Sequence, residues 1–301
     1  MKIFGNTVFT FSKKQQTYID VPSERSDSSV KMSNEENSIA LSFEVCDTTE
    51  KMEQQTASTI EEMLKERGFS VESVNNFPMP TAITSFSFTL VKNYAICSEF
   101  YKEIRTSFSN PEHKGYYARK NNQDDRTWNK ILEIGDLLNS MGIFTKYYRT
   151  LQKIMFTTTT APKAINYING SYLENYSAKI ISDVLEELSV NRRFEDYELL
   201  QNVVIKDENG NSHELDCVMR IGNELFWAEI KSGKCSDFDK YRKIGLSLGV
   251  NPDCHILLLA EGNSDSCSVL SYFYECFISN ISTFKTDLRT MFRNAIEQSL
   301  D

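Results

Sequence analysis

Two acidic residues and one lysine in the second half of the chain have the types and spacing needed to hydrolyse a phosphodiester bond. Asp216 lies in the segment ELDCVMR, and Glu229 and Lys231 lie in the segment LFWAEIK. Alternate residues of a strand point to the same face, so Glu229 and Lys231 are expected to share one face. A tight turn at Gly222 and Asn223 would fold Asp216 back towards them. The sequence therefore predicts two carboxylates and one ammonium group at one end of a hairpin.

This combination suits metal-dependent hydrolysis. Carboxylates are the hard oxygen ligands that Mg²⁺ and Mn²⁺ take, so Asp216 and Glu229 are expected to hold the metal. The backbone carbonyl of Ile230 is a natural third ligand. A bound metal ion would neutralise a phosphate oxygen and generate hydroxide from water. Lys231 is expected to orient or deprotonate that water and to offset charge in the transition state.

The alternative for the same three residues is an exposed strand with no chemical role. Glu-x-Lys is common on exposed strands, and an Asp about a dozen residues earlier often arises by chance. The context favours the site. Residues 225–228 are all apolar and Ile230 separates Glu229 from Lys231, which is typical of a strand covered on both faces. A glutamate and a lysine at the end of a buried strand need partners, and a metal site supplies them.

Hydrophobic periodicity places these residues within a regular succession of elements. The expected elements are a helix at 171–188, strands at 197–205, 213–221 and 224–231, a helix at 236–248 and a strand at 255–260, followed by helical chain to the end. Turn signals at 207–211 and 222–223 separate the first three strands. The sequence therefore predicts a C-terminal core of order αβββαβ in a protein of the α/β class, α+β overall.

The first half of the chain shows shorter patterns. They predict strands at 1–21, 39–46 and 82–96, helices at 50–67, 99–108 and 128–141, and a loop at 111–125. A helix followed by a β-rich basic segment, over 128–160, fits a piece of a winged helix, although many α+β fragments share that pattern. Pro162 and the small residues around it indicate a boundary near 158–168. We therefore expect an N-terminal α+β domain at 1–160 and a C-terminal domain at 161–301.

The composition is that of a globular protein, with 301 residues, 40% apolar and 25% charged. No apolar run is long enough to span a bilayer, and the first residues lack the features of a secretory signal. The seven cysteines are scattered and form no C-x-x-C pair, which favours reduced thiols over a disulfide framework or a zinc site. These features predict a cytoplasmic protein without membrane contact.

Taken alone, the formal net charge of −9 argues against a nucleic-acid-binding protein, which usually shows a basic surface. Residues 101–160 depart from that average, with ten Lys and Arg against six Asp and Glu, a local excess of +4. Within this stretch, residues 113–120 place tyrosines among basic residues, a combination that can stack on bases. The alternative is an exposed loop on a solvated surface with random scatter of charge.

Two longer segments resemble a known family. The run HELDCVMRIGNELFWAEIKSG resembles the core of the PD-(D/E)XK nucleases, in which an Asp, a hairpin and Glu-x-Lys follow one another. The preceding GSYLENY resembles the helix that opens this domain in effector nucleases attached to CRISPR systems. The resemblance spans about residues 168–262. It implies a restriction-endonuclease-like core in which Glu174 joins Asp216 and Glu229 at the metal.

The resemblance also implies a function. A Mg²⁺- or Mn²⁺-dependent endonuclease in prokaryotic defence would cut DNA, with RNA as a further substrate, and would form a homodimer or a larger assembly because each site cuts one strand. The same fold can lose metal binding and act as a nucleic-acid-binding or scaffolding module, but all four expected site residues are present here. The candidates for contacting the nucleic acid are Lys234, Lys240, Tyr241 and Lys243, for which a solvated helix face is the alternative.

The N-terminal half departs from the family pattern. Those effectors usually carry an N-terminal Rossmann-like domain that senses cyclic oligonucleotides. Residues 1–150 show no clear βαβ alternation and no Gly-rich phosphate turn, so the sequence does not support activation by such a messenger. We expect this half to bind a partner protein, to position nucleic acid or to mediate assembly.

Overall fold

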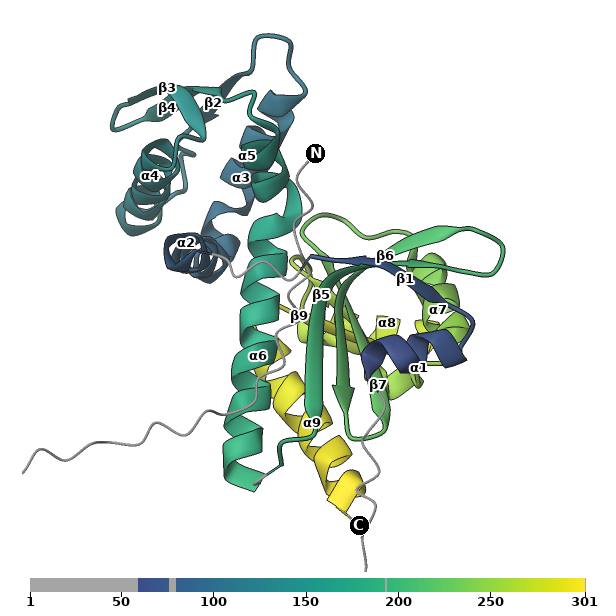
Figure 1. Ribbon diagram of the computed structural model, residues 1–301. Coiled ribbons are helices and arrows are strands. Elements are labelled where there is room, and N and C mark those ends of the chain that lie inside the picture. The colour runs from purple at the N-terminus through teal and green to yellow at the C-terminus, as the bar shows by residue number, and fades with distance from the viewer. Residues whose placement is uncertain (1–58, 76–79, 193, 301) are drawn as a thin grey trace, which may run out of the picture. The chain divides into compact units, whose positions relative to one another are not determined.

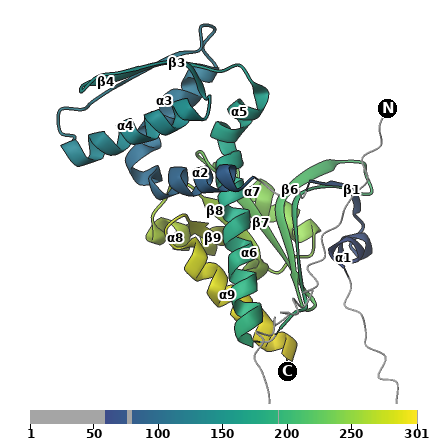
Figure 2. The same ribbon diagram turned by 60° about the vertical axis from the view of Figure 1, so that its left-hand side comes forward.

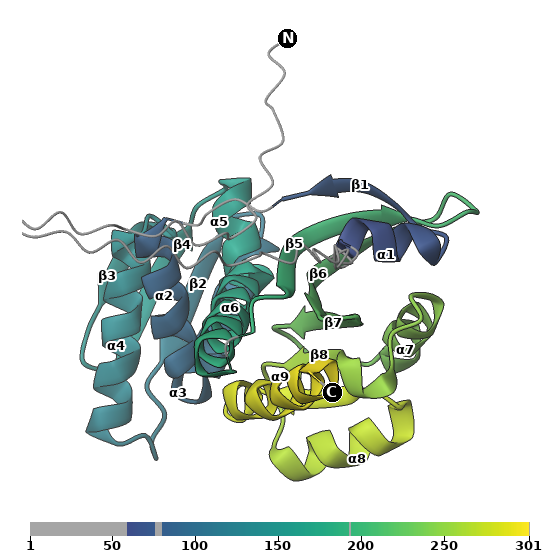
Figure 3. The same ribbon diagram turned by 60° about the horizontal axis from the view of Figure 1, so that its bottom comes forward.

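A mixed sheet forms the centre of the computed structural model, which describes residues 59–75, 80–192 and 194–300 (Figure 1). Its strands are β1 (Ser70–Val74), β5 (Tyr197–Lys206), β6 (Ser212–Ile221), β7 (Glu224–Lys231), β8 (His255–Leu259) and β9 (Phe277–Asn280). They follow one another in the order β1-β5-β6-β7-β8-β9, of which Figure 3 shows the run from β1 to β8. The pairs from β1 to β7 are antiparallel, whereas β7-β8 and β8-β9 are parallel.

Helices cover both faces of this sheet. They are α6 (Tyr172–Arg192), α7 (Phe238–Ser247), α8 (Ser264–Tyr274) and α9 (Phe284–Leu300), with α1 (Ile60–Glu66) next to β1. Strand β8 shows the two faces most clearly, because Ile256 and Leu258 join the main core with α6 and α9, whereas Leu257 and Leu259 pack with residues of α7 and α8. Helices α6 and α9 run side by side (Figure 2). The apolar sequence of β8 follows from this coverage on both sides.

The order α6-β5-β6-β7-α7-β8 confirms the predicted αβββαβ succession and the mixed α+β class. The predicted helix at 50–67 ends as expected, since α1 is followed by Gly68 with a φ of +84°, but α1 begins only at Ile60, after the N-cap Thr59, and residues 50–58 lie outside the described part. The strands predicted at 1–21 and 39–46 lie outside the described residues. After residue 260 the chain is not helical throughout, because β9 adds a sixth strand to the sheet.

A smaller sheet belongs to the segment between residues 80 and 160. The elements of this segment are α2 (Thr81–Lys92), α3 (Tyr94–Phe108), β2 (Lys114–Ala118), α4 (Asp125–Ser140), β3 (Phe144–Arg149) and β4 (Lys153–Thr158). The three strands pair in the order β2-β4-β3, all antiparallel. The β3-β4 hairpin follows α4 as the sequence predicted for a piece of a winged helix, but a single helix lies between β2 and the hairpin, whereas a helix-turn-helix has two in succession.

Two sequence predictions in this segment are wrong. Residues 82–96 form α2 and the start of α3, because Ile83, Ser87, Leu90 and Val91 follow helical spacing and face the core. Alternating phenylalanines and the β-branched content favoured a strand there. Residues 114–118, expected within a loop, form β2 along β4.

Many contacts cross the predicted boundary near 158–168 and join residues before it to residues after it. Strand β1 pairs with β5, and α2 packs on α6, where the rings of Phe88 and Tyr176 lie 4.8 Å apart. The described residues from 59 onward cluster as one compact unit. The division into domains at 1–160 and 161–301 remains a prediction. Among the described residues, no helix combines the length and the apolar character that crossing a membrane requires.

Candidate active site

Strands β6 and β7 bring Asp216 and Glu229 together. Their antiparallel register pairs Cys217 with Ala228, and one further step places Asp216 opposite Glu229. The backbone N–H of Ile230 donates a hydrogen bond to Asp216 Oδ2 at 2.7 Å. This bond fixes the carboxyl of Asp216 beside β7, as the turn at Gly222 and Asn223 predicted.

Glu229 and Lys231 lie on the same face of β7, as predicted. Both face the side of the sheet that α7 and α8 cover, since their parallel partners on β8 are Leu257 and Leu259. Lys231 Nζ forms an ion pair with Glu229 Oε1. The second oxygen, Glu229 Oε2, is buried and has no hydrogen-bond partner. A buried carboxylate oxygen without a partner is costly, so this atom points to a ligand.

Glu174 enters the site from the first turn of α6. A π-helical turn at Tyr167–Ser171 precedes that helix, and a Cβ on Gly170 would lie 3.1 Å from Glu174 Oε1. The absence of a side chain at Gly170 therefore leaves room for the carboxyl. Ser232, directly after β7, hydrogen bonds to the carbonyl of Asn169. The start of α6 is thereby tied to the end of the strand that carries Lys231.

The acids of the site resist ionisation. Burial, followed by the charge of Asp216, raises the pKa of Glu174 to about 7 and that of Glu229 also to about 7. Burial raises the pKa of Asp216 too, against the opposing effects of the Ile230 N–H and of Lys231. Burial lowers the pKa of Lys231, but Glu229 and Asp216 outweigh it and hold the pKa above its ordinary value. Lys231 is therefore an ammonium ion at neutral pH.

Helix α7 adds an aromatic and a basic residue. Lys231 Nζ lies 4.9 Å from the centre of the Tyr241 ring, and Lys240 Nζ lies 5.5 Å from it on the same helix. Lys240 also lowers the pKa of Glu229, which brings it within electrostatic reach of the site. Lys234 and Lys243 are exposed, and no contact links either of them to Glu229 or Lys231 in the described part of the chain. Of the four residues predicted to contact nucleic acid, Lys240 and Tyr241 thus lie next to Lys231.

Residues of α3 that the sequence did not single out also reach the end of β7. Arg105 Nη1 donates a hydrogen bond to the carbonyl oxygen of Ser232 at 3.1 Å, and the Tyr94 hydroxyl donates to the same oxygen at 3.3 Å. Tyr94 lies equally close to Glu261 Oε1, at 3.3 Å. No sequence signal identifies these partners, because each contact joins residues more than a hundred positions apart.

The donor set fits Mg²⁺ or Mn²⁺. Glu174, Asp216 and Glu229 offer hard oxygen atoms, and the buried Oε2 of Glu229 lacks a partner. Over the described residues, no three His, Cys, Asp or Glu side chains form a ready metal cluster. Mg²⁺ does not require one, since it usually keeps several waters and binds through one or two carboxylates and substrate phosphates. Asp216 and Glu229 suffice for that, and Glu174 and the Ile230 carbonyl remain predicted ligands.

No protein-family model matches the sequence, and none of the curated proteins compared with it shows significant similarity. The fold is shared with solved structures. One is Can2 from Sulfobacillus thermosulfidooxidans in complex with cyclic tetra-adenylate, with a TM-score of 0.55 and 15% identity over 78% of this chain and 61% of Can2. Another is protein VC1899 from Vibrio cholerae, with a TM-score of 0.53 and 14% identity over 81% of this chain and 62% of that protein.

The chain spans about three fifths of the length of Can2 and of VC1899. At identities of 14–15% the likeness shows the fold and leaves the activity to be argued from the site. In both comparisons the shared part is about four fifths of this chain, which is more than the predicted C-terminal core alone.

Proposed function

We propose that this chain is a Mg²⁺- or Mn²⁺-dependent endonuclease that hydrolyses phosphodiester bonds of DNA. The observation that carries the proposal is the Glu229 carboxylate, which is buried opposite Asp216 with one oxygen on Lys231 and the other without a partner. Burial of the Asp216 and Glu229 carboxylates destabilises the folded protein, and apolar packing around them does not offset that penalty. A divalent cation between Asp216 and Glu229 would repay that cost.

Each residue has a role that its surroundings support. Asp216 and Glu229 would hold the metal, with Glu174 completing the site from α6 and the carbonyl of Ile230 as a further oxygen donor. The metal would polarise the phosphate and lower the pKa of a bound water. The raised pKa of Lys231 supports a cationic role, in which the ammonium group orients the water and offsets charge on the phosphate, over that of a general base. Lys240 and Tyr241 line the approach for the nucleic acid.

The biological setting is proposed on the fold. Can2 shares it and was solved with cyclic tetra-adenylate, a molecule made of linked nucleotides. We therefore place this chain in prokaryotic defence, as a homodimer or larger assembly with one strand cut at each site. Cyclic tetra-adenylate is the first effector to test, although the sequence of residues 1–150 gives no support for a messenger-binding domain.

The test is a cleavage assay with the full chain. Purified protein is incubated with plasmid, linear duplex, single-stranded DNA and RNA, in Mg²⁺, Mn²⁺ or EDTA, with and without cyclic tetra-adenylate. The matched variant is Asp216→Asn, which keeps the size of the side chain and an oxygen for the Ile230 N–H but removes the charge. We expect cleavage that needs metal, is lost in EDTA and is lost in the variant. Cleavage that persists in EDTA and in Asp216→Asn would contradict the proposal.

The non-enzymatic alternative gives a different result. A silent module would cleave none of the substrates under any condition and would show the same thermal unfolding with and without Mg²⁺. An enzyme that awaits a partner would also be silent, but Mg²⁺ would raise its unfolding temperature and Asp216→Asn would abolish the increase. The metal titration therefore separates these two outcomes.

A further inference from the structure

The sheet β2-β4-β3 leaves one of its faces uncovered. Its other face is part of the core, since Tyr117, Ile154 and Phe156 are buried. The rings of Tyr117 and Phe156 contact Phe100 of α3, and Tyr117 also stacks on Trp128 of α4. The register aligns the uncovered side chains in two rows across the strands. We define this open face by those rows, which are Tyr116, Met155 and Tyr148, and Lys114, Thr157 and Lys146.

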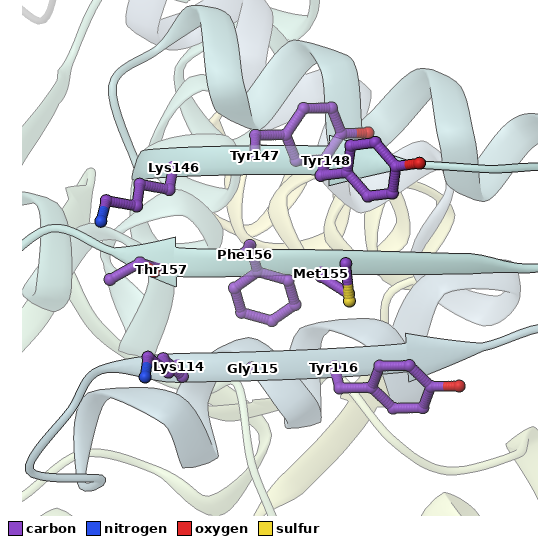
Figure 4. Close-up of a pocket in the computed structure, with 9 residues that line it drawn as sticks. All are labelled: Lys114, Gly115, Tyr116, Lys146, Tyr147, Tyr148, Met155, Phe156 and Thr157. Atoms are coloured by element: carbon purple, nitrogen blue, oxygen red, sulfur yellow. The ribbon is translucent and has the colours of Figure 1, made fainter.

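The first row exposes apolar surface where a strand would normally carry polar residues. The side chains of Tyr116, Tyr148 and Met155 are 53%, 57% and 37% exposed. Figure 4 shows them side by side on the three strands, with the second row next to them. A hollow of about 460 Å³ lies along these residues. Two tyrosines on the outer strands stand about 10 Å apart, twice the spacing of neighbouring strands.

The charge of this small sheet is opposite to that of the protein. Strands β2, β3 and β4 contain four basic residues, Lys114, Lys146, Arg149 and Lys153, and neither Asp nor Glu. The whole chain has a net charge of −9. Lys146 has no ion-pair partner among the described residues. Lys114 pairs with Glu112, but both side chains are about two thirds exposed, and such pairs exchange readily.

Exposed aromatic rings with lysines beside them suit single-stranded nucleic acid. Bases that are not paired can stack on tyrosine rings, and lysines can hold the phosphates. In a duplex the base faces are covered, so the rings would have nothing to stack on. The helix that would enter a major groove in a winged helix is α4, and it carries three acids (Asp125, Glu133, Asp136) against Arg126 and Lys130. That helix therefore does not favour a phosphate backbone.

We propose that the open face binds single-stranded nucleic acid, with bases stacked on Tyr116 and Tyr148 and phosphates held by Lys114 and Lys146. This binding site goes beyond the proposed nuclease chemistry, because it needs neither metal nor cleavage. It also gives the positive segment at 101–160 a role, since Lys114 and Tyr116, which the sequence placed in a loop, lie on β2 beside Lys146 and Tyr148 of β3.

The test measures binding in EDTA, where metal-dependent cleavage is absent. Labelled 20-nucleotide single strands of mixed sequence, as DNA and as RNA, and the matched duplex are titrated with the full chain by fluorescence anisotropy. The variant is Tyr116→Ala with Tyr148→Ala. Its matched control is Tyr272→Ala with Phe273→Ala, which removes two rings of α8 that are 83% and 68% exposed. Circular dichroism and the unfolding temperature check that both variants fold.

We expect the wild type to bind single strands more tightly than the duplex. The Tyr116 and Tyr148 pair should weaken single-strand binding by about 10-fold or more, while the α8 control changes it less than about 2-fold. Equal affinity of both variants, preference for the duplex, or no binding by the wild type would overturn the proposal. So would a change of oligomeric state in the tyrosine variant with unchanged oligonucleotide affinity, which would assign the face to a second copy of the chain.

Lysine substitutions test the phosphate contacts separately. Lys146→Gln should weaken single-strand binding several-fold and lower the dependence of affinity on salt by about one phosphate contact. The control Lys163→Gln removes an exposed lysine of α5 (Pro162–Asn166) and should leave both quantities unchanged. Equal effects of the two substitutions would mean that binding follows total charge and does not use the open face.

Discussion

The two candidate sites of this chain handle charge in opposite ways. At the end of β7 the carboxylate of Glu229 is buried, with the residue only 5% exposed, and its partner Lys231 lies against the Tyr241 ring. On the open face of β2, β3 and β4 the groups are exposed and only positive, and tyrosine rings stand in water beside them. One region holds a few charges in fixed positions, and the other offers a broad surface.

This difference matches two separate tasks, cleavage of the phosphodiester bond at the end of β7 and binding of the nucleic acid on the open face, if both proposals hold. Burial raises the pKa of Glu174 and Glu229 to about 7. The same burial destabilises the folded state and strengthens the electrostatic interactions within the site. Exposed lysines and rings cost the fold little and act on a flexible polymer through many weak contacts. The proposed nuclease would need both properties, and the two candidate sites lie on different sheets.

The sharpest way to break this division is Lys231→Ala. Without its ammonium group we expect cleavage to fall by about 10²- to 10³-fold, because charge on the phosphate is no longer offset. Binding of single strands in EDTA should stay within about 2-fold of wild type, because the open face does not include Lys231. Initial cleavage rates and anisotropy titrations on the same preparations measure the two effects.

The control for this substitution is Lys163→Ala, which removes an exposed lysine from α5. It should leave both the rate and the affinity unchanged. If Lys231→Ala weakened single-strand binding as much as it slowed cleavage, the strand-end site would also be the main binding surface and the division would fail.

The acidity of Glu174 predicts a stability effect whose sign depends on pH. The folded protein holds the proton of Glu174 up to a pKa of about 7, against an ordinary value of 4.5. Between these values the unfolded chain loses the proton first, so this group's contribution to stability is lost as pH rises from about 4.5 to 7. Glu174→Gln cannot ionise. Without metal, the variant should be more stable than wild type by about 1–3 kcal/mol at pH 8 and similar to it near pH 4.5.

Metal should reverse this order. Mg²⁺ binds the ionised carboxylate, so it should stabilise wild type at pH 8 more than Glu174→Gln. Urea unfolding of both proteins at pH 4.5 and pH 8, in EDTA and in Mg²⁺, measures the eight free energies of unfolding. A variant that is less stable than wild type in EDTA at pH 8 would show that Glu174 has a structural role, and an equal response to Mg²⁺ would remove Glu174 from the metal site.

The strand-end site could be predicted because local rules determine it. Alternation along β7 places Glu229 and Lys231 on one face, and a two-residue turn fixes the register that brings Asp216 to them. The αβββαβ order follows from periodicity in the same way. These features depend on neighbours within about fifteen residues, apart from the packing of α6. Glu174 is different, because only the resemblance to the effector nucleases, and no local rule, assigned it to the site.

The rest could not be predicted because it depends on distant partners. The run 82–96 satisfies a strand pattern and a helix pattern equally, and only packing on α6, as at Phe88 and Tyr176, favours the helix. Residues 114–118 have the composition of a loop, and their pairing with β4 makes them a strand. The hydrogen bond from Arg105 to Ser232 likewise joins residues far apart in the sequence, 127 positions from each other.

Removing the hydrogen bond between Arg105 and Ser232 should have an effect of intermediate magnitude on cleavage. Arg105 and Tyr94 donate to the carbonyl of Ser232, one residue after Lys231. Arg105→Ala should let the end of β7 shift and slow cleavage by roughly 3- to 10-fold, with the Mg²⁺ concentration for half-maximal rate unchanged. The matched control is Arg126→Ala, an exposed arginine of α4. Equal rates for wild type and Arg105→Ala would mean that the contact of α3 with β7 does not position Lys231.

The smallest predicted effect distinguishes two lysines on α7. Both are exposed, but Lys240 lies over the Tyr241 ring and lowers the pKa of Glu229, whereas no contact joins Lys243 to the site among the described residues. Lys240→Ala should raise the substrate concentration for half-maximal cleavage about 2- to 5-fold, and Lys243→Ala should change it less, because its charge reaches the site only through solvent, where salt screens it. Initial rates at low and high salt measure both. A larger effect for Lys243→Ala would place the nucleic acid along the outer side of α7, away from Tyr241.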